Sequence, residues 1–323
     1  MKSPAATKGR PGRTWLTAAL LAALVLASAT LVFRRSVYEP PSSASVPAKV
    51  PLGDAAAAAP EEAVVFSAVG SVQRATAGGD WSPLSAGDRL RADDAIRTAK
   101  GGSAGLRIGE RSHLSVAEAS QLSIRELTRA VHRLRLERGR IAVDYQPDGR
   151  RVLRIENEAS GGVAETTSAR FSVLSTGTTV AVATETGSVD LRAADKVVRV
   201  AAGSQAVVQR GEAPGAPEQI PVKLLLKVSG TALAPGPRDL CARVEGTAQS
   251  GAQVLIDGAP AEVDAKGRFS VPVPREPKNK RTVLVAMRDV LGREELRTVP
   301  CEGAPSEPAI HDFAIRWRNK RPP

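Results

Sequence analysis

An uncharged apolar run near the start of the chain constrains its architecture more than any other feature. The run extends from Trp15 to Phe33, reads WLTAALLAALVLASATLVF and contains no ionisable side chain. A helix rises ~1.5 Å per residue, so a helix over this run would be ~28 Å long, which is close to the hydrocarbon thickness of a bilayer. The run therefore predicts one transmembrane helix over residues 15–33.

The basic residues that flank the run predict its orientation. Four of them precede it and a double arginine follows it, namely Lys2, Lys8, Arg10, Arg13, Arg34 and Arg35. The positive-inside rule then makes residues 1–14 a short cytoplasmic tail and places the rest of the chain outside. We expect a single-pass protein of the bacterial inner membrane whose bulk lies in the periplasm.

A cleaved signal peptide is the alternative interpretation of the same run. Ala27-Ser28-Ala29 fits a small-residue cleavage site after a basic segment and an apolar segment. The apolar residues continue through Phe33 to the double arginine, which favours a retained signal anchor. Both interpretations export the body of the chain.

The only two cysteines, Cys241 and Cys301, agree with export. A disulfide between them would close a loop of about 60 residues and stabilise the fold by about 4 kcal/mol in the chain-entropy model. Such a bond persists in an oxidising compartment. The alternative is a pair of buried free thiols.

The remaining sequence predicts two all-β domains joined by connections. Residues 34–62 form a linker rich in Pro, Ala and Ser. Residues 63–212 show short alternating segments separated by turn residues, which is typical of a β-sandwich or β-roll. A connection over residues 213–233 leads to a smaller β-sandwich over residues 234–303, and residues 304–323 form a basic tail.

Glycines mark expected turns in the first of these domains. Gly70, Gly139 and Gly187 each stand before an apolar alternating segment, so we expect turns with positive φ at these positions. Leu134–Glu137 and Ile141–Asp144 are accordingly predicted as two separate strands. In the smaller domain, Asp257-Gly258 and Lys266-Gly267 have the chemistry of hairpin turns.

The first β domain resembles the FecR family. The motifs that carry the resemblance, in chain order, are Gly70-Ser71-Val72, Trp81 to Asp88, Asp94 to Thr98, Leu106 to Gly109, Arg170 to Val173, Gly187-Ser188-Val189 and Ala202-Gly203. Ser168-Ala169 departs from the Gly-Thr that FecR domains usually carry before the late phenylalanine.

The resemblance implies a role in envelope signalling, because FecR regulators relay an outer signal to a cytoplasmic sigma factor. Only about 14 residues precede the predicted span, too few to fold an anti-sigma domain. A direct anti-sigma role is therefore disfavoured.

The smaller domain resembles the immunoglobulin-like domains of the glucodextranase type. The resemblance implies that a disulfide between Cys241 and Cys301 joins the first and last strands of this domain.

Residues with catalytic or metal-binding patterns are missing from the sequence, so we predict no enzyme, no cofactor and no metal. His113, His132 and His311 are far apart and lack the ligand spacing of a zinc site. Nucleotide-binding and hydrolase motifs are absent. Asp257 and Asp264 fit a turn-stabilising role better than an acid pair.

A cluster of arginines is the most unusual local feature. Arg133, Arg135, Arg138, Arg140 and Arg154 are candidates for contact with a polyanion or a protein partner. The alternative is a solvated sheet face balanced by Glu137, Asp144 and Glu156.

The net charge of +11 does not predict nucleic-acid binding, because much of the excess lies at the two ends of the chain and aromatics are only 3% of residues. We therefore expect a membrane-anchored binding or scaffold protein whose partner is another envelope protein or an anionic glycan. The alternative is a cell-wall or polysaccharide-binding accessory protein.

Overall fold

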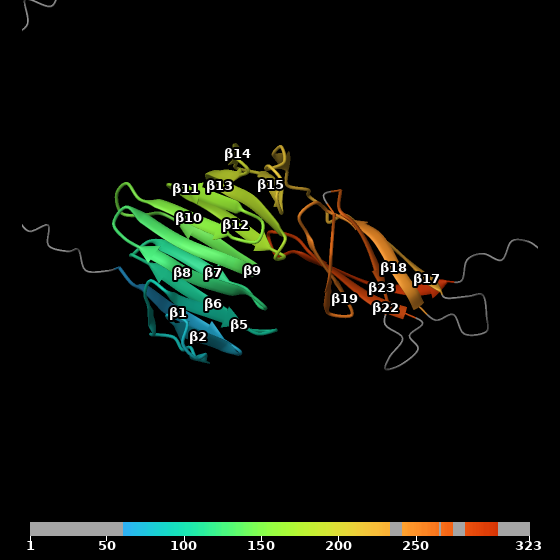
Figure 1. Cartoon of the computed structure of the whole chain (residues 1–323), viewed down its shortest axis with the longest axis horizontal. Coiled ribbons are helices and arrows are strands. Elements are labelled where there is room, and N and C mark those ends of the chain that lie inside the picture. The colour runs from blue at the N-terminus through green and yellow to red at the C-terminus, as the bar shows by residue number, and fades with distance from the viewer. Residues whose placement is uncertain (1–60, 233–240, 265, 274–281, 303–323) are drawn as a thin grey trace, which may run out of the picture. The chain divides into compact units, whose positions relative to one another are not determined.

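The computed structural model describes residues 61–232, 241–264, 266–273 and 282–302 (Figure 1). Every regular element in these ranges is a β-strand, which confirms the all-β prediction. All of these residues fall within one compact unit, Ala58–Pro323. The predicted transmembrane helix over residues 15–33 lies outside the described residues. Within the described ranges, no helix has the length and apolar character needed to cross a membrane.

Residues 63–219 form two sheets, which we call the large β unit. The first sheet has the strand order β16-β15-β13-β12-β9-β7-β6-β1-β4. Its strands are β1 (Ala63–Val69), β4 (Arg89–Leu90), β6 (Ser103–Ile108), β7 (Ser112–Val116), β9 (Val131–Tyr145), β12 (Ala169–Ser175), β13 (Thr179–Ala193), β15 (Ser204–Gln209) and β16 (Glu218–Gln219).

The second sheet has the order β3-β2-β5-β8-β9-β10-β11-β13-β14 and shares β9 and β13 with the first sheet. Only β9 and β10 pair in parallel among these strands. The strands that belong to the second sheet alone are β2 (Val72–Thr76), β3 (Ser82–Pro83), β5 (Asp94–Thr98), β8 (Gln121–Leu127), β10 (Val152–Asn157), β11 (Gly162–Thr166) and β14 (Lys196–Ala201).

Apolar side chains from both sheets of the large β unit form one continuous core. The alternation of the strands produces this core, because every second residue of a strand points to the same face. In β9, Leu134 and Leu136 are buried while Arg133 and Arg135 remain partly exposed. Aliphatic residues make up most of the core.

Two glycines allow β9 and β13 to pass from one sheet into the other. In β9 the pairing with β12 begins at Gly139, and in β13 the pairing with β12 ends at Gly187. Their φ angles are 89° and 79°, so the predicted positive φ is confirmed. The prediction of separate strands before and after Gly139 is wrong. Glycine there bends a continuous 15-residue strand and does not end it.

The bend at Gly187 predicts a specific cost of substitution. A Cβ atom there would lie 2.6 Å from the backbone oxygen of Ser168, whereas Gly203, at φ 77°, has no atom within 4 Å of its Cβ position. Gly203→Ala should cost about 1 kcal/mol from backbone strain alone. Gly187→Ala should cost roughly 3 kcal/mol, because a steric clash is added to the strain. Urea unfolding of both variants checks the difference, and equal midpoints would contradict it.

Residues 226–302 form a seven-stranded sheet assembly, which we call the small β unit. Its order is β20-β19-β22-β23-β17-β18-β21, and β17 and β23 pair in parallel. The strands are β17 (Leu226–Ala232), β18 (Cys241–Ala248), β19 (Gln253–Ile256), β20 (Ala259–Ala261), β21 (Arg268–Pro272), β22 (Thr282–Arg288) and β23 (Glu294–Glu302). The predicted hairpin turn at Asp257-Gly258 is confirmed, with φ angles of 50° and 86° between β19 and β20.

A disulfide joins Cys241 of β18 to Cys301 of β23. The predicted disulfide is confirmed. Within residues 234–303, where it was expected to join the first and last strands, it joins the first and last described strands, while β17 precedes both in sequence. β17 lies between the two bonded strands and pairs with both. A Cβ atom on Gly230 of β17 would lie only 2.8 Å from the Cys301 Sγ. The Cα atoms of the two cysteines are 5.0 Å apart, and the Cys301 Sγ lies against a position of β17 that has no side chain.

Candidate functional site

Three of the arginines singled out in the sequence lie together on the outer face of the second sheet. Arg154 of β10 is directly opposite Arg133 of β9, and Arg135 is two residues further along β9. Each is paired with a carboxylate: Arg133 with Glu126 at 3.6 Å, Arg135 with Glu158 at 2.6 Å and Arg154 with Glu165 at 2.9 Å. The balancing acids are therefore not the Glu137, Asp144 and Glu156 that the sequence suggested.

These pairs belong to a row of charged residues that we call the charged ladder. In register across six strands it consists of Glu126, Arg133, Arg154, Glu165, Asp190 and Arg199. The row contains three positive and three negative side chains, so its net charge is zero. Surface ion pairs of this kind stabilise by about 0–1 kcal/mol each. The ladder favours a solvated sheet face over a polyanion site.

The bend at Gly139 separates the other two arginines from the charged ladder. Arg138 is exposed and forms no hydrogen bond or ion pair with the described residues. Arg140 belongs to the first sheet, where its guanidinium lies against Gly292. Burial lowers the pKa of Arg140, and the nearby Asp289 carboxylate opposes that shift. The five arginines therefore do not form one contiguous stripe.

A second row on the same outer face was not found from the sequence. Gln73, Arg97, Gln121 and Arg138 are register partners across β2, β5, β8 and β9, and we call them the amide-guanidinium row. Arg97 donates to the Gln73 side-chain oxygen at 2.7 Å and lies 4.3 Å over the ring of Trp81. The members of this row are far apart in the sequence. The only sequence signal for them is the alternation along each strand, which predicts that each side chain points outward.

Two adjacent glutamates hold the start of β1 to the large β unit. Glu61 accepts hydrogen bonds from His132 Nε2 at 2.8 Å and Arg151 at 3.0 Å. Glu62 forms ion pairs with Arg89 at 3.0 Å and Arg91 at 2.6 Å. These side chains tether the point at which the chain enters the fold.

His132 is the centre of this tether and is 1% exposed. Its Nε2–H donates to the Glu61 carboxylate. Its Nδ1 therefore accepts the hydrogen bond of the Tyr145 hydroxyl, which lies 3.1 Å away. Burial lowers the pKa of His132, and the hydrogen bond to Glu61 partly opposes the shift. Burial also raises the pKa of Tyr145. The imidazole therefore links Glu61 to Tyr145 and resists protonation. Separately, the described residues contain no group of ligands that could hold a metal ion.

The lowered pKa of His132 predicts a pH dependence of stability. The unfolded imidazole binds a proton near pH 6.5, while the folded one resists protonation. The stability it contributes is therefore complete above about pH 6.5 and declines as the pH falls toward the folded pKa. His132→Gln should remove this part of the pH dependence. Urea midpoints of both proteins between pH 7.5 and 5.5 test this, and parallel curves would contradict it.

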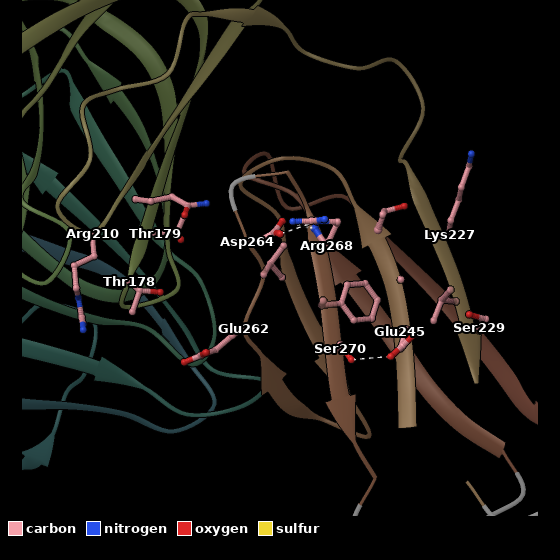
Figure 2. Close-up of a pocket in the computed structure, with 16 residues that line it drawn as sticks. Thr178, Thr179, Arg210, Lys227, Ser229, Glu245, Glu262, Asp264, Arg268 and Ser270 are labelled. Carbon is pink, nitrogen blue, oxygen red and sulfur yellow. Dashed lines mark hydrogen bonds and ion pairs between the residues drawn. The ribbon is translucent and has the colours of Figure 1, made fainter. Parts of the chain in front are cut away.

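A cavity of about 1090 Å³ is lined by residues of β17, β18 and β21, together with Thr178, Thr179, Gln209, Arg210 and residues 262–264. Figure 2 shows Lys227, Ser229, Glu245 and Ser270 along one wall, with Thr178, Thr179 and Arg210 on the other side. Ser270 donates to Glu245 at 2.9 Å, and Asp264 accepts from the Arg268 side chain at 2.8 Å.

Asp264 also accepts the backbone N–H groups of Lys266 and Arg268, which confirms its turn role. Ser270 is thus paired with Glu245, and Asp264 with Arg268, along the lining of this cavity.

One family model matches part of the large β unit. Residues 94–190 match the family described as FecR protein. The matched stretch runs from β5 to the crossing in β13 and contains the motifs at Asp94–Thr98, Leu106–Gly109, Arg170–Val173 and Gly187–Val189. This part of the chain is therefore similar to a FecR domain.

Two solved structures show a weaker likeness. Both are crystal structures of a protein proposed to be an anti-sigma factor from Parabacteroides distasonis, at 15% and 14% identity, each with a TM-score of 0.35. The likeness covers 39% of this chain and 59% of those chains. We take neither fold nor function from it. No curated protein matches the chain.

Proposed function

We propose that this chain is a membrane-anchored module of a FecR-type envelope signalling system, which binds another envelope protein through its exported β units. The single observation that carries the proposal is the FecR match over residues 94–190. In this proposal residues 15–33 are the membrane anchor and the β units stand in the periplasm.

The disulfide supports the exported location. Cys241 and Cys301 are the only cysteines, and they are bonded to each other. Disulfides persist in oxidising compartments and are rare in the cytosol. The bond also closes a long loop, which is where the chain-entropy model gives a large contribution of about 4 kcal/mol.

The charges of the large β unit support protein binding over a general polyanion role. The charged ladder has no net charge, and Arg140 is half-buried. A balanced surface attracts a phosphate-rich polymer weakly, because affinity for such polymers follows the number of unpaired cations.

A cysteine at an exposed position tests the location. Val222 is 92% exposed and lies between the two β units in sequence. In Val222→Cys, a membrane-impermeant maleimide should label spheroplasts before permeabilisation, because the β units face outward. The wild-type chain, whose cysteines are bonded, is the matched control. Labelling that appears only after permeabilisation would contradict the proposal.

The amide-guanidinium row favours a second candidate function, an accessory protein that binds a cell-wall glycan or polysaccharide. An indole ring, two side-chain amides and two guanidinium groups lie together on one sheet face. Aromatic faces and amides are groups that carbohydrates contact by stacking and hydrogen bonding.

One comparison separates the two functions. If the chain binds glycan, Arg97→Ala with Arg138→Ala should reduce cosedimentation with purified peptidoglycan or exopolysaccharide by about tenfold. Arg133→Ser with Arg135→Ser is the control, because those arginines are already paired. If the chain signals, its deletion should change transcription of a defined gene set while glycan binding is absent. Glycan binding with unchanged transcription would replace the signalling proposal by the accessory role.

A further inference from the structure

The two sheets of the large β unit have four edge strands, and three of them are only two residues long. β4 and β16 end the first sheet, and β3, which contains Pro83, ends the second sheet on one side. Short edge strands and edge prolines are devices that prevent unwanted pairing with other chains. The three edges are therefore protected.

The fourth edge, β14, is neither short nor interrupted by proline. It runs for six residues and pairs with β13 from Ser188↔Ala201 to Ala193↔Lys196 without a bulge. Among the residues that the structure describes, no strand pairs with its other side. A regular strand with one unpaired side presents a row of free N–H and C=O groups.

The side chains of β14 are of the kind found in a strand that has a neighbouring strand on both sides. It reads Lys-Val-Val-Arg-Val-Ala and contains no proline. Val200 is buried, Val198 is half-buried opposite the buried Leu191, and Val197 is 48% exposed. Valine is enriched in strands because it packs well on a pleated surface. A further strand beside β14 would cover Val198 and extend the apolar core by one position.

The charges on β14 indicate what kind of segment fits. Its two ionisable residues, Lys196 and Arg199, are both cationic. Arg199 already pairs with Asp190 of β13, at 2.9 Å, on the covered side. A carboxylate on a strand added to the open side would meet the same guanidinium. A second copy of this chain would instead bring two more cations to the edge, and like charges across strands are unfavourable.

We propose that β14 receives an extended segment of another protein, with alternating apolar residues and a carboxylate, as an added antiparallel strand. Main-chain hydrogen bonds would supply affinity, while contacts with Val198 and Arg199 would supply selectivity. This names the recognition mode of the proposed envelope partner. The location of that partner in the envelope rests on the proposed function. The strand pairing itself is tested separately.

The test uses the full chain and a synthetic probe. The probe is a capped, fluorescently labelled peptide with the sequence of residues 187–193, because that segment of β13 already pairs with β14 and carries Asp190. The variant is Val198→Lys, whose ammonium can reach solvent at the open edge and would be buried by an added strand. The matched control is Val197→Lys, on the opposite face of the same strand.

We expect saturable binding to the wild-type chain and to Val197→Lys, and binding at least about tenfold weaker to Val198→Lys. A peptide N-methylated at alternate backbone amides should not bind. Hydrogen exchange of amides 196–201 should slow when the unmodified peptide is added. Unchanged urea midpoints would show that both variants remain folded.

Several results would overturn the proposal. Equal binding to both lysine variants would place the peptide elsewhere, and no binding to the wild-type chain would remove the edge as a docking site. A dimer that Val198→Lys abolishes would assign the edge to a second copy. Full protection of amides 196–201 in the free chain would assign it to a segment of the same chain. None of these readouts depends on maleimide labelling or transcription, so failure of the proposed function would be seen separately.

Discussion

The large β unit depends on two strands that belong to both of its sheets. β9 and β13 each pass from one sheet to the other, so the apolar core is enclosed by continuous strands. Such a passage needs a backbone conformation that is easy for glycine alone, and glycine occupies both crossing points. The close approach of neighbouring backbone at Gly187 adds a steric requirement to the conformational one.

The same arrangement determines where charged side chains can meet. A change of sheet within a strand moves successive outward residues onto different faces of the protein. Arg138 and Arg140 are neighbours in sequence, yet one is exposed on the second sheet and the other is half-buried on the first. Clusters of charge in the sequence are therefore a poor guide to clusters of charge on this surface.

The sequence indicated the all-β class and the turn at Asp257-Gly258, because each follows from local alternation or turn chemistry. It did not reveal that β9 is continuous, because a glycine that bends a strand and a glycine that ends one look the same locally. The amide-guanidinium row and the Glu61–His132–Tyr145 contacts join residues far apart in the chain, so only the strand register brings them together.

The paired glutamates before β1 have a mechanical consequence. A pull on the chain that precedes Glu61 would load the ion pairs of Glu61 and Glu62 before it reached the hydrogen bonds between β1 and β6. Side-chain contacts of this kind give way one at a time, whereas a strand ladder pulled along its length resists as a whole. Force along the chain would thus break the side-chain contacts of Glu61 and Glu62 first. These contacts can re-form, and the folded core would remain undisturbed.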